Sequence, residues 1–304
     1  MSRDLLPNDL REAHPSNPDA RTIADTPREP EQEIEQEGTG SVSSILERTQ
    51  EIARRPLSSA AGRAVLYDRG RGYRLTATQI RTLAELGTFR VVACYDLGEH
   101  AYRGQQGLAQ RDVDYLVVHG LVRRGTFHGP EHLPRELLTL TTRGYRLVQA
   151  NTLVPHDQAV YRGFVKPKEA NHDADLYRLY QKEAARIENE GGKNIRVILD
   201  CELKGKINRD IDRFGGSARP EIAERHGLRT VRNKIPVPDL RVEYETRDGE
   251  AARVNLELVT EHYRGRSVAE KVRAGFRLFT PRGEADHLRR VLDRQELRAK
   301  VFSL

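Results

Sequence analysis

Two acidic residues stand at matching places in two alternating segments near the C-terminus. Asp239 follows Pro238 at the head of IPVPDLRVEYE, and Glu257 lies within ARVNLELVTEH. Asp248-Gly249, between the two segments, predicts a tight hairpin turn. Because strand side chains alternate with period two, both acids fall on the polar face, opposite or diagonal to each other. Two converging carboxylates form a minimal site for a hard divalent cation, which favours oxygen ligands.

A lysine in the next predicted helix is the candidate third member of this site. The helix is expected over Ser267–Phe279, and Lys271 falls inside its buried stripe. A lysine in that position either extends its amine to solvent or reaches the carboxylate pair. The alternative for the hairpin is an ordinary amphipathic one with a solvated, charged polar face.

A mixed sheet flanked by helices is expected to position these residues, in a domain spanning 165–304. It would begin with a helix over 171–190, where His172-Asp173 is expected to favour the helix dipole rather than take part in chemistry. A buried strand, Ile195–Cys201, comes next, then polar helical segments and the hairpin strands 237–247 and 252–261. A final amphipathic helix is expected near Glu284–Arg298.

Residues 70–150 predict a winged-helix DNA-binding domain, with three helices followed by a two-stranded wing. Thr76 and Gln79 form a capping box at the start of the first helix. The third helix, Gly107–His119, would lie in the major groove. The candidate base-reading residues are Gln105, Gln106, Gln110, Arg111 and Asp114, and the candidate phosphate contacts are Arg123, Arg124 and Arg135. The alternative is a winged helix that contacts protein, or a solvated polar face.

Composition favours a DNA-directed protein of about two domains. The 304 residues carry a net charge of +6. Residues 1–60 hold 7 basic and 12 acidic residues, so the rest holds 44 against 33. A basic body attracts polyanions, and double-stranded DNA is the expected partner. No apolar run is long enough for a membrane span, and two cysteines fit a reducing cytoplasm.

The N-terminal segments are expected to lie outside the folded body. Residues 1–40 are rich in proline and acids, which predicts a disordered tail. Residues 41–56 predict a short amphipathic helix that docks on the body or on a second copy of the chain, so a homodimer is one expected assembly.

The order helix, strand, Pro-Asp strand, Glu strand and helix resembles the PD-(D/E)xK nuclease fold. With the preceding winged helix, residues 74–300 resemble the replication-relaxation family of plasmids and mobile elements. The resemblance implies that Asp239 and Glu257 hold Mg²⁺, with a main-chain carbonyl near Leu258 or Val259 as a further ligand. Glu183 on the first helix would contribute through water.

One position departs from the nuclease pattern. The pattern has lysine two residues after the glutamate, and this chain has Val259. Lysine there would position the attacking water and offset charge on the phosphate. Lys271 is the candidate substitute, as in some divergent members of the fold.

These features together predict an α+β or α/β protein, a winged helix followed by a PD-(D/E)xK-like mixed sheet flanked by helices. The expected function is that of a plasmid or mobile-element DNA-binding protein. If Lys271 completes the site, it would also be a Mg²⁺-dependent endodeoxyribonuclease. One alternative is a non-enzymatic accessory factor that works with replication or mobilisation proteins. Another is a winged-helix transcription regulator that senses a small molecule.

Overall fold

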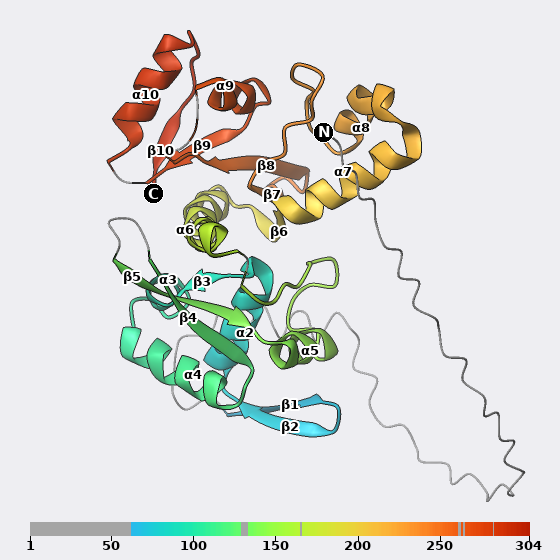
Figure 1. The fold of residues 1–304 in the computed structure, drawn as a ribbon. Helices are drawn as coiled ribbons and strands as arrows, with labels where there is room; N and C mark the ends of the chain where they lie inside the picture. The colour runs from blue at the N-terminus through green and yellow to red at the C-terminus, as the bar shows by residue number, and fades with distance from the viewer. Residues whose placement is uncertain (1–61, 129–132, 165, 261–262, 264, 282) are drawn as a thin grey trace, which may run out of the picture. The chain divides into compact units, whose positions relative to one another are not determined.

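A computed structural model describes residues 62–128, 133–164, 166–260, 263, 265–281 and 283–304 (Figure 1). Within these residues the fold is mixed, with helices and three β-sheets, which confirms the coarse fold class. The predicted acidic tail and the short helix over 41–56 lie outside the described residues. No helix in the described part of the chain is long and apolar enough to cross a membrane.

The N-terminal part of the described chain builds two small sheets around a helical core. A hairpin comes first, followed by three helices with a short strand between the first and the second, then two more strands and a closing helix. The elements are β1 (Ala64–Asp68), β2 (Arg71–Leu75), α2 (Ala77–Phe89), β3 (Val92–Ala93), α3 (Cys94–His100), α4 (Gln106–Val118), β4 (Val122–His128), β5 (Pro134–Leu140) and α5 (Thr142–Ala150). Strands β3, β5 and β4 form an antiparallel sheet in that order. The hairpin β1–β2 was not predicted.

The capping box predicted for the first of these helices is present. The Thr76 hydroxyl accepts a hydrogen bond from the Gln79 amide at 3.2 Å, and the Gln79 side chain accepts one from the Thr76 amide at 3.0 Å. These bonds satisfy two amides that have no partner within the helix. Helix α2 therefore begins where the sequence predicts.

The C-terminal part is a five-stranded sheet with helices on both faces (Figure 1). The strand order is β10-β9-β8-β7-β6, antiparallel from β6 to β8 and parallel from β8 to β10. The elements are α6 (Pro167–Asn189), β6 (Lys193–Leu199), α7 (Asp200–Phe214), a 3₁₀ turn (Gly216–Ala218), α8 (Arg219–Arg225), β7 (Leu240–Glu245), β8 (Ala251–Leu258), α9 (Gly265–Arg273), β9 (Arg277–Thr280), α10 (Ala285–Arg294) and β10 (Val301–Ser303).

The two faces of this sheet bury different apolar sets, as alternation requires. Leu240, Val242 and Leu256 pack with α6 in the main core. On the other face, Ile198 packs with α7 and α8. Val259 on that side packs beneath α9 and α10. The polar face of the hairpin is thus covered by helices at the end that carries Glu257, whereas Arg253 near the turn is exposed.

The helix predicted over Ser267–Phe279 is wrong in its second half. Helix α9 ends at Arg273, and residues 277–280 form β9, parallel to β8. Gly275 has a φ of +82°, a left-handed conformation that favours glycine and ends the helix. Phe276 follows the helix cap, and Phe279 lies in the strand. The strand β10 after α10 was not predicted either.

Candidate active site

The two predicted carboxylates meet at the ends of β7 and β8. Leu240 pairs with Leu256, so Asp239 and Glu257 occupy the next pair of the same antiparallel register. The Asp239 amide lies 3.3 Å from Glu257 Oε2, to which it donates. The Leu258 amide donates to Asp239 Oδ2 at 2.9 Å. Each carboxylate therefore contacts the backbone of the opposite strand, on the face predicted from alternation.

Lys271 reaches this pair from the neighbouring helix. Its Nζ lies 2.7 Å from Glu257 Oε1 and donates to the Val237 carbonyl at 2.8 Å. Of the two outcomes considered for this lysine, extension to solvent is therefore wrong. Val259, where the nuclease pattern has lysine, is buried in the apolar cluster beneath α9. The ammonium group thus comes from α9 and not from β8.

The end of α9 explains why Lys271 is held at this place. The Phe276 amide donates to the Lys271 carbonyl at 3.1 Å, and the Gly275 amide donates to the Val272 carbonyl at 2.9 Å. This is the Schellman pattern that closes a helix C-terminus. The Lys271 amine also lies 5.5 Å from the centre of the Phe276 ring. Backbone and ring together fix the lysine stem.

Burial and charge give Glu257 an unusual protonation equilibrium. Its side chain is 0% exposed. Burial, followed by the charge of Asp239, raises the pKa of Glu257 to about 7, and Lys271 and the Tyr263 hydroxyl partly offset the rise. The Tyr263 hydroxyl donates to Glu257 Oε1 at 3.1 Å. A carboxylate pair held this close is stabilised by any cation that enters it.

His172 is a member of the site that the sequence argument assigned to a different role. Its Nε2 lies 3.5 Å from Asp239 Oδ2. Burial lowers the pKa of His172, but the hydrogen bond and charge of Asp239 outweigh it and raise the pKa to about 9. Helix α6 begins at Pro167, not near His172, so this residue lies in the second turn. Its spacing of four from Leu176 places it on the sheet-facing stripe, and that spacing was the available signal.

Helix α7 contributes a second acid–lysine pair beside the first. The Asp200 amide donates to the Asp239 carbonyl at 3.1 Å, and Lys204 Nζ lies 2.6 Å from Asp200 Oδ2. Burial lowers the pKa of Lys204, but Asp200, Asp239 and Glu257 together raise it. The field of the carboxylate pair therefore extends to a partly exposed lysine.

The structure does not bring Glu183 to this site. Glu183 lies eleven residues after His172 on α6, which is about 16 Å along the helix axis. Its carboxylate accepts hydrogen bonds from Arg277 at 2.6 Å and from Arg186 at 2.6 Å. Two guanidinium groups neutralise it, so its role is to tie α6 to β9. The expectation that Glu183 reaches a metal through water finds no support in this geometry.

The donor set decides whether Mg²⁺ fits. Among the described residues, no group of three or more histidine, cysteine or acidic side chains could hold a metal by itself. Mg²⁺ commonly binds one or two carboxylates and completes its shell with water and substrate phosphate oxygens. Asp239 and Glu257 supply two carboxylates for such an arrangement, and Lys271 and His172 are the cations that pair with them in this structure.

The candidate DNA-reading residues divide by exposure. Gln105, Gln110, Arg111, Asp114 and Arg123 are exposed. Gln110 donates to Asp114 at 2.9 Å, so these two side chains form a pair on the outer face of α4. The Arg123 guanidinium lies 4.8 Å from the centre of the Phe164 ring.

The other candidates are engaged within the protein. Arg135 is 16% exposed and binds Asp96 at 3.0 Å and Asp175 at 2.8 Å, so it joins β5 to α3 and α6. This geometry assigns it a structural role in place of the expected phosphate contact. Gln106 donates to the Tyr95 carbonyl at 3.1 Å and to Glu99 at 3.0 Å, which fastens α4 to α3. Arg124 is shared by Asp114 at 2.5 Å and Glu136 at 3.3 Å.

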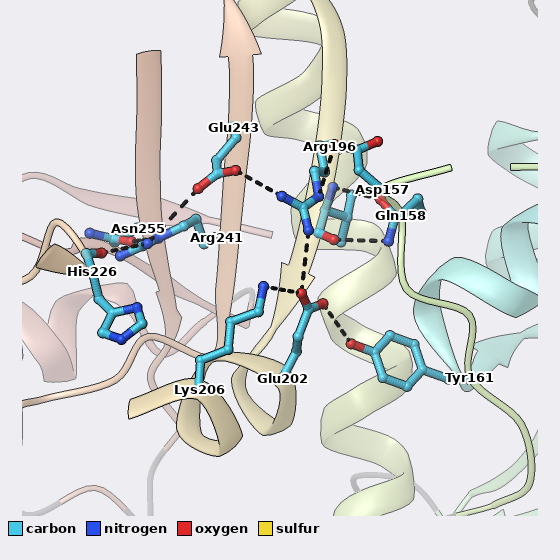
Figure 2. A network of polar contacts seen from close by, with 11 residues as sticks. Asp157, Gln158, Tyr161, Arg196, Glu202, Lys206, His226, Arg241, Glu243 and Asn255 are labelled. Carbon is cyan, nitrogen blue, oxygen red and sulfur yellow. Dashed lines mark hydrogen bonds and ion pairs between the residues drawn. The ribbon is translucent and has the colours of Figure 1, made fainter. Parts of the chain in front are cut away.

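A second polar cluster, drawn in Figure 2, lies around Arg196 on β6. Arg196 is within 3.4 Å of Asp157 and Glu202 and 3.3 Å of Glu243. Lys206 binds Glu202 at 2.6 Å. A hollow of about 560 Å³ borders the Arg196 side. The charges of this network largely satisfy one another, and we interpret it as the fastening of the loop after α5 to the sheet.

Comparisons with protein-family models, with curated proteins and with solved structures found no match to this chain.

Proposed function

We propose that this chain is a DNA-binding protein of the replication-relaxation type, with a winged helix followed by a PD-(D/E)xK-like domain that cleaves phosphodiester bonds. The contact of 2.7 Å between Lys271 and Glu257 supports cleavage most directly. Through this contact Lys271 supplies the amine that the nuclease pattern has at position 259. The order α6, β6, β7, β8 and α9 is the order on which the resemblance rests.

The DNA-binding part rests on α2, α3 and α4 with the sheet β3-β5-β4. The exposed polar side chains on α4 have the length and the hydrogen-bonding groups that reading base edges requires. Among the residues proposed to contact DNA, the exposed arginines are Arg111 on α4 and Arg123 on β4. The duplex would be held by phosphate contacts and oriented by α4.

In the proposed reaction each side chain has a separate task. Asp239 and Glu257 would hold Mg²⁺, which supplies an activated water and charge stabilisation when bound. Lys271 is placed to orient the water and to offset the growing negative charge on the phosphate. The backbone amides of Asp239 and Leu258 hold the two carboxylates in place.

The test is cleavage of supercoiled plasmid with Mg²⁺ by the wild type and by the variants Asp239→Asn, Glu257→Gln and Lys271→Met. We expect each variant to lose about a hundredfold or more of the rate, since each removes a charge from the reacting centre. Glu250→Gln, at the exposed hairpin turn, is the matched control and should cut normally. Calorimetry with Mg²⁺ provides a second readout, because Asp239→Asn should bind the ion more weakly. Full activity in the three site variants would refute the catalytic assignment.

A second candidate is a non-enzymatic accessory factor with the same DNA-binding surface. It is favoured by the pairing of Glu257 with Lys271 and of Asp239 with His172, because two cations of the chain already balance the two acids. In that case the wild type binds duplex DNA and cuts it at no metal concentration.

A further inference from the structure

The hairpin β1–β2 carries a basic outer surface that neither α4 nor the carboxylate site uses. Residues 62–75 contain four arginines and one acid, Asp68. The four arginines are exposed, and they are Arg63, Arg69, Arg71 and Arg74. Arg69 and Gly70 have φ values of 50° and 78° and make the tight turn, so Arg69 lies at the tip.

The one acid of the hairpin does not offset this charge at the surface. Asp68 is buried and binds Arg146 of α5 at 2.9 Å. That hydrogen bond lowers the pKa of Asp68, so the pair is ionised and internally neutral. The exposed charge of the hairpin therefore comes from its arginines, with Arg74 on the face of Val65 and Arg71 on the other face, 5.2 Å from the centre of the Tyr73 ring.

Exposed apolar groups lie among the arginines. Val65 pairs with Arg74, and Tyr67 pairs with Gly72, so these four residues share the outer face. Tyr67 is 59% exposed, and Val65 is 43% exposed. The Tyr67 ring lies across Gly72, where an added Cβ would come within 3.2 Å of it. The ring therefore presents its remaining face to solvent, between positive charges.

The hairpin is fastened to the helix proposed to read DNA. The Tyr115 hydroxyl of α4 donates to the Arg74 carbonyl at 3.1 Å. Asn151 donates to the Tyr67 carbonyl at 3.0 Å and accepts from the Tyr67 amide at 3.3 Å. A duplex bound to α4 would thus find the hairpin beside it in a fixed position.

We propose that β1–β2 is a second DNA-contact element, which binds the phosphate backbone of the duplex next to the part read by α4. The proposal rests on the proposed function and extends it. Evenly spaced phosphates match a ribbon with four exposed arginines, and an exposed tyrosine adds a surface for sugar or base contact. A DNA duplex fits this combination better than an acidic protein, which offers no such stacking surface.

The test is the salt dependence of duplex binding by the double variant Arg69→Gln/Arg71→Gln. Each phosphate contact contributes about 0.9 to the slope of log K against log salt, so we expect the slope to fall by about 1.8 and the affinity to fall at least tenfold. The matched control is Arg289→Gln/Arg290→Gln on α10, which changes the net charge equally. It should behave like the wild type.

A spectroscopic readout reports the contact directly. The chain contains no tryptophan, so Tyr67→Trp introduces a single one. We expect its fluorescence to change when a duplex is added and to recover at high salt. An unchanged signal would contradict the proposal.

The outcomes distinguish a failure of the proposed function from a failure of the hairpin assignment. If the wild type binds no duplex, the proposed function fails, and this inference fails with it. If Arg111→Gln weakens binding while the hairpin variant matches its control, only the hairpin assignment is overturned. A surface that retains an acidic protein partner but not DNA would overturn it as well.

Discussion

Glu257 is a fully buried acid whose charge is set by neighbours from three other segments. Burial raises its pKa most, Asp239 adds to the rise, and Lys271 and Tyr263 lower it. The sequence located Asp239 and Glu257 because alternation and a Gly-containing turn fix both face and register. It could not settle Lys271, because the reach of a long side chain depends on helix packing. It misassigned His172, because the start of α6 was placed four residues late.

His172 should make stability depend on pH in a defined direction. Its pKa is about 9 in the folded protein, against about 6.5 in an unfolded chain. The folded state therefore holds the proton more tightly, and this stabilisation is complete below pH 6.5 and lost as the pH rises through 9. We expect His172→Gln to be less stable than the wild type by about 2 kcal/mol at pH 6, with little difference at pH 10. Urea denaturation without divalent cations measures this.

The opposite trend would contradict the contact with Asp239. His156→Gln is the matched control, because it makes the same substitution at an exposed position.

At the scale of elements, helices and strands with a local signal were predictable and those fixed by tertiary contacts were not. The capping box of Thr76 and Gln79, which spans four residues, identifies the start of α2. Phe276 and Phe279 keep the spacing of a helical stripe, although both lie beyond the true helix end at Arg273. Strand β9 forms because residues 277–280 pair with β8 and, on their other edge, with β10, and neither partner is close in sequence.

Gly275 links the end of α9 to the position of Lys271, and its replacement should show this. Gly275→Ala places a Cβ in a left-handed conformation, which we expect to cost about 1–2 kcal/mol in the free energy of unfolding. Because the cap also holds the Lys271 stem, the cleavage rate should fall by more than the loss of folded protein accounts for. Gly249→Ala, with a φ of +85° in the hairpin turn, is the matched control. If the two variants are equally destabilised and cleave at equal rates, the helix cap has no effect on the carboxylate site.

At the scale of the whole molecule, the two predicted domains share one core. Apolar side chains from Tyr73 to Leu304 form a continuous cluster, and α6 contributes to it from the middle of the chain. Phe89 of α2 packs against Tyr177 of α6, with ring centres 5.1 Å apart. Composition and periodicity locate each domain, but they carry no information on whether the two will pack together.

This shared core predicts that the body unfolds as one cooperative unit. Calorimetry should give a single transition whose van't Hoff and calorimetric enthalpies agree. Tyr177→Ala should lower the free energy of unfolding by about 3–5 kcal/mol and shift that entire transition. Tyr95→Ala, at an exposed site on α3, should have little effect. Two transitions, of which only one moves, would mean that the domains are independent.

The distance along the chain between Glu257 and Lys271 has a consequence for recognising proteins of this kind. A sequence pattern with lysine two residues after the glutamate does not match this chain, because Lys271 follows Glu257 by fourteen residues and lies on a different element. A structural search for three charged side-chain atoms at given distances, independent of their order in the sequence, would find it. Distant relatives of this protein are therefore better sought by the spatial arrangement of these atoms than by a sequence pattern.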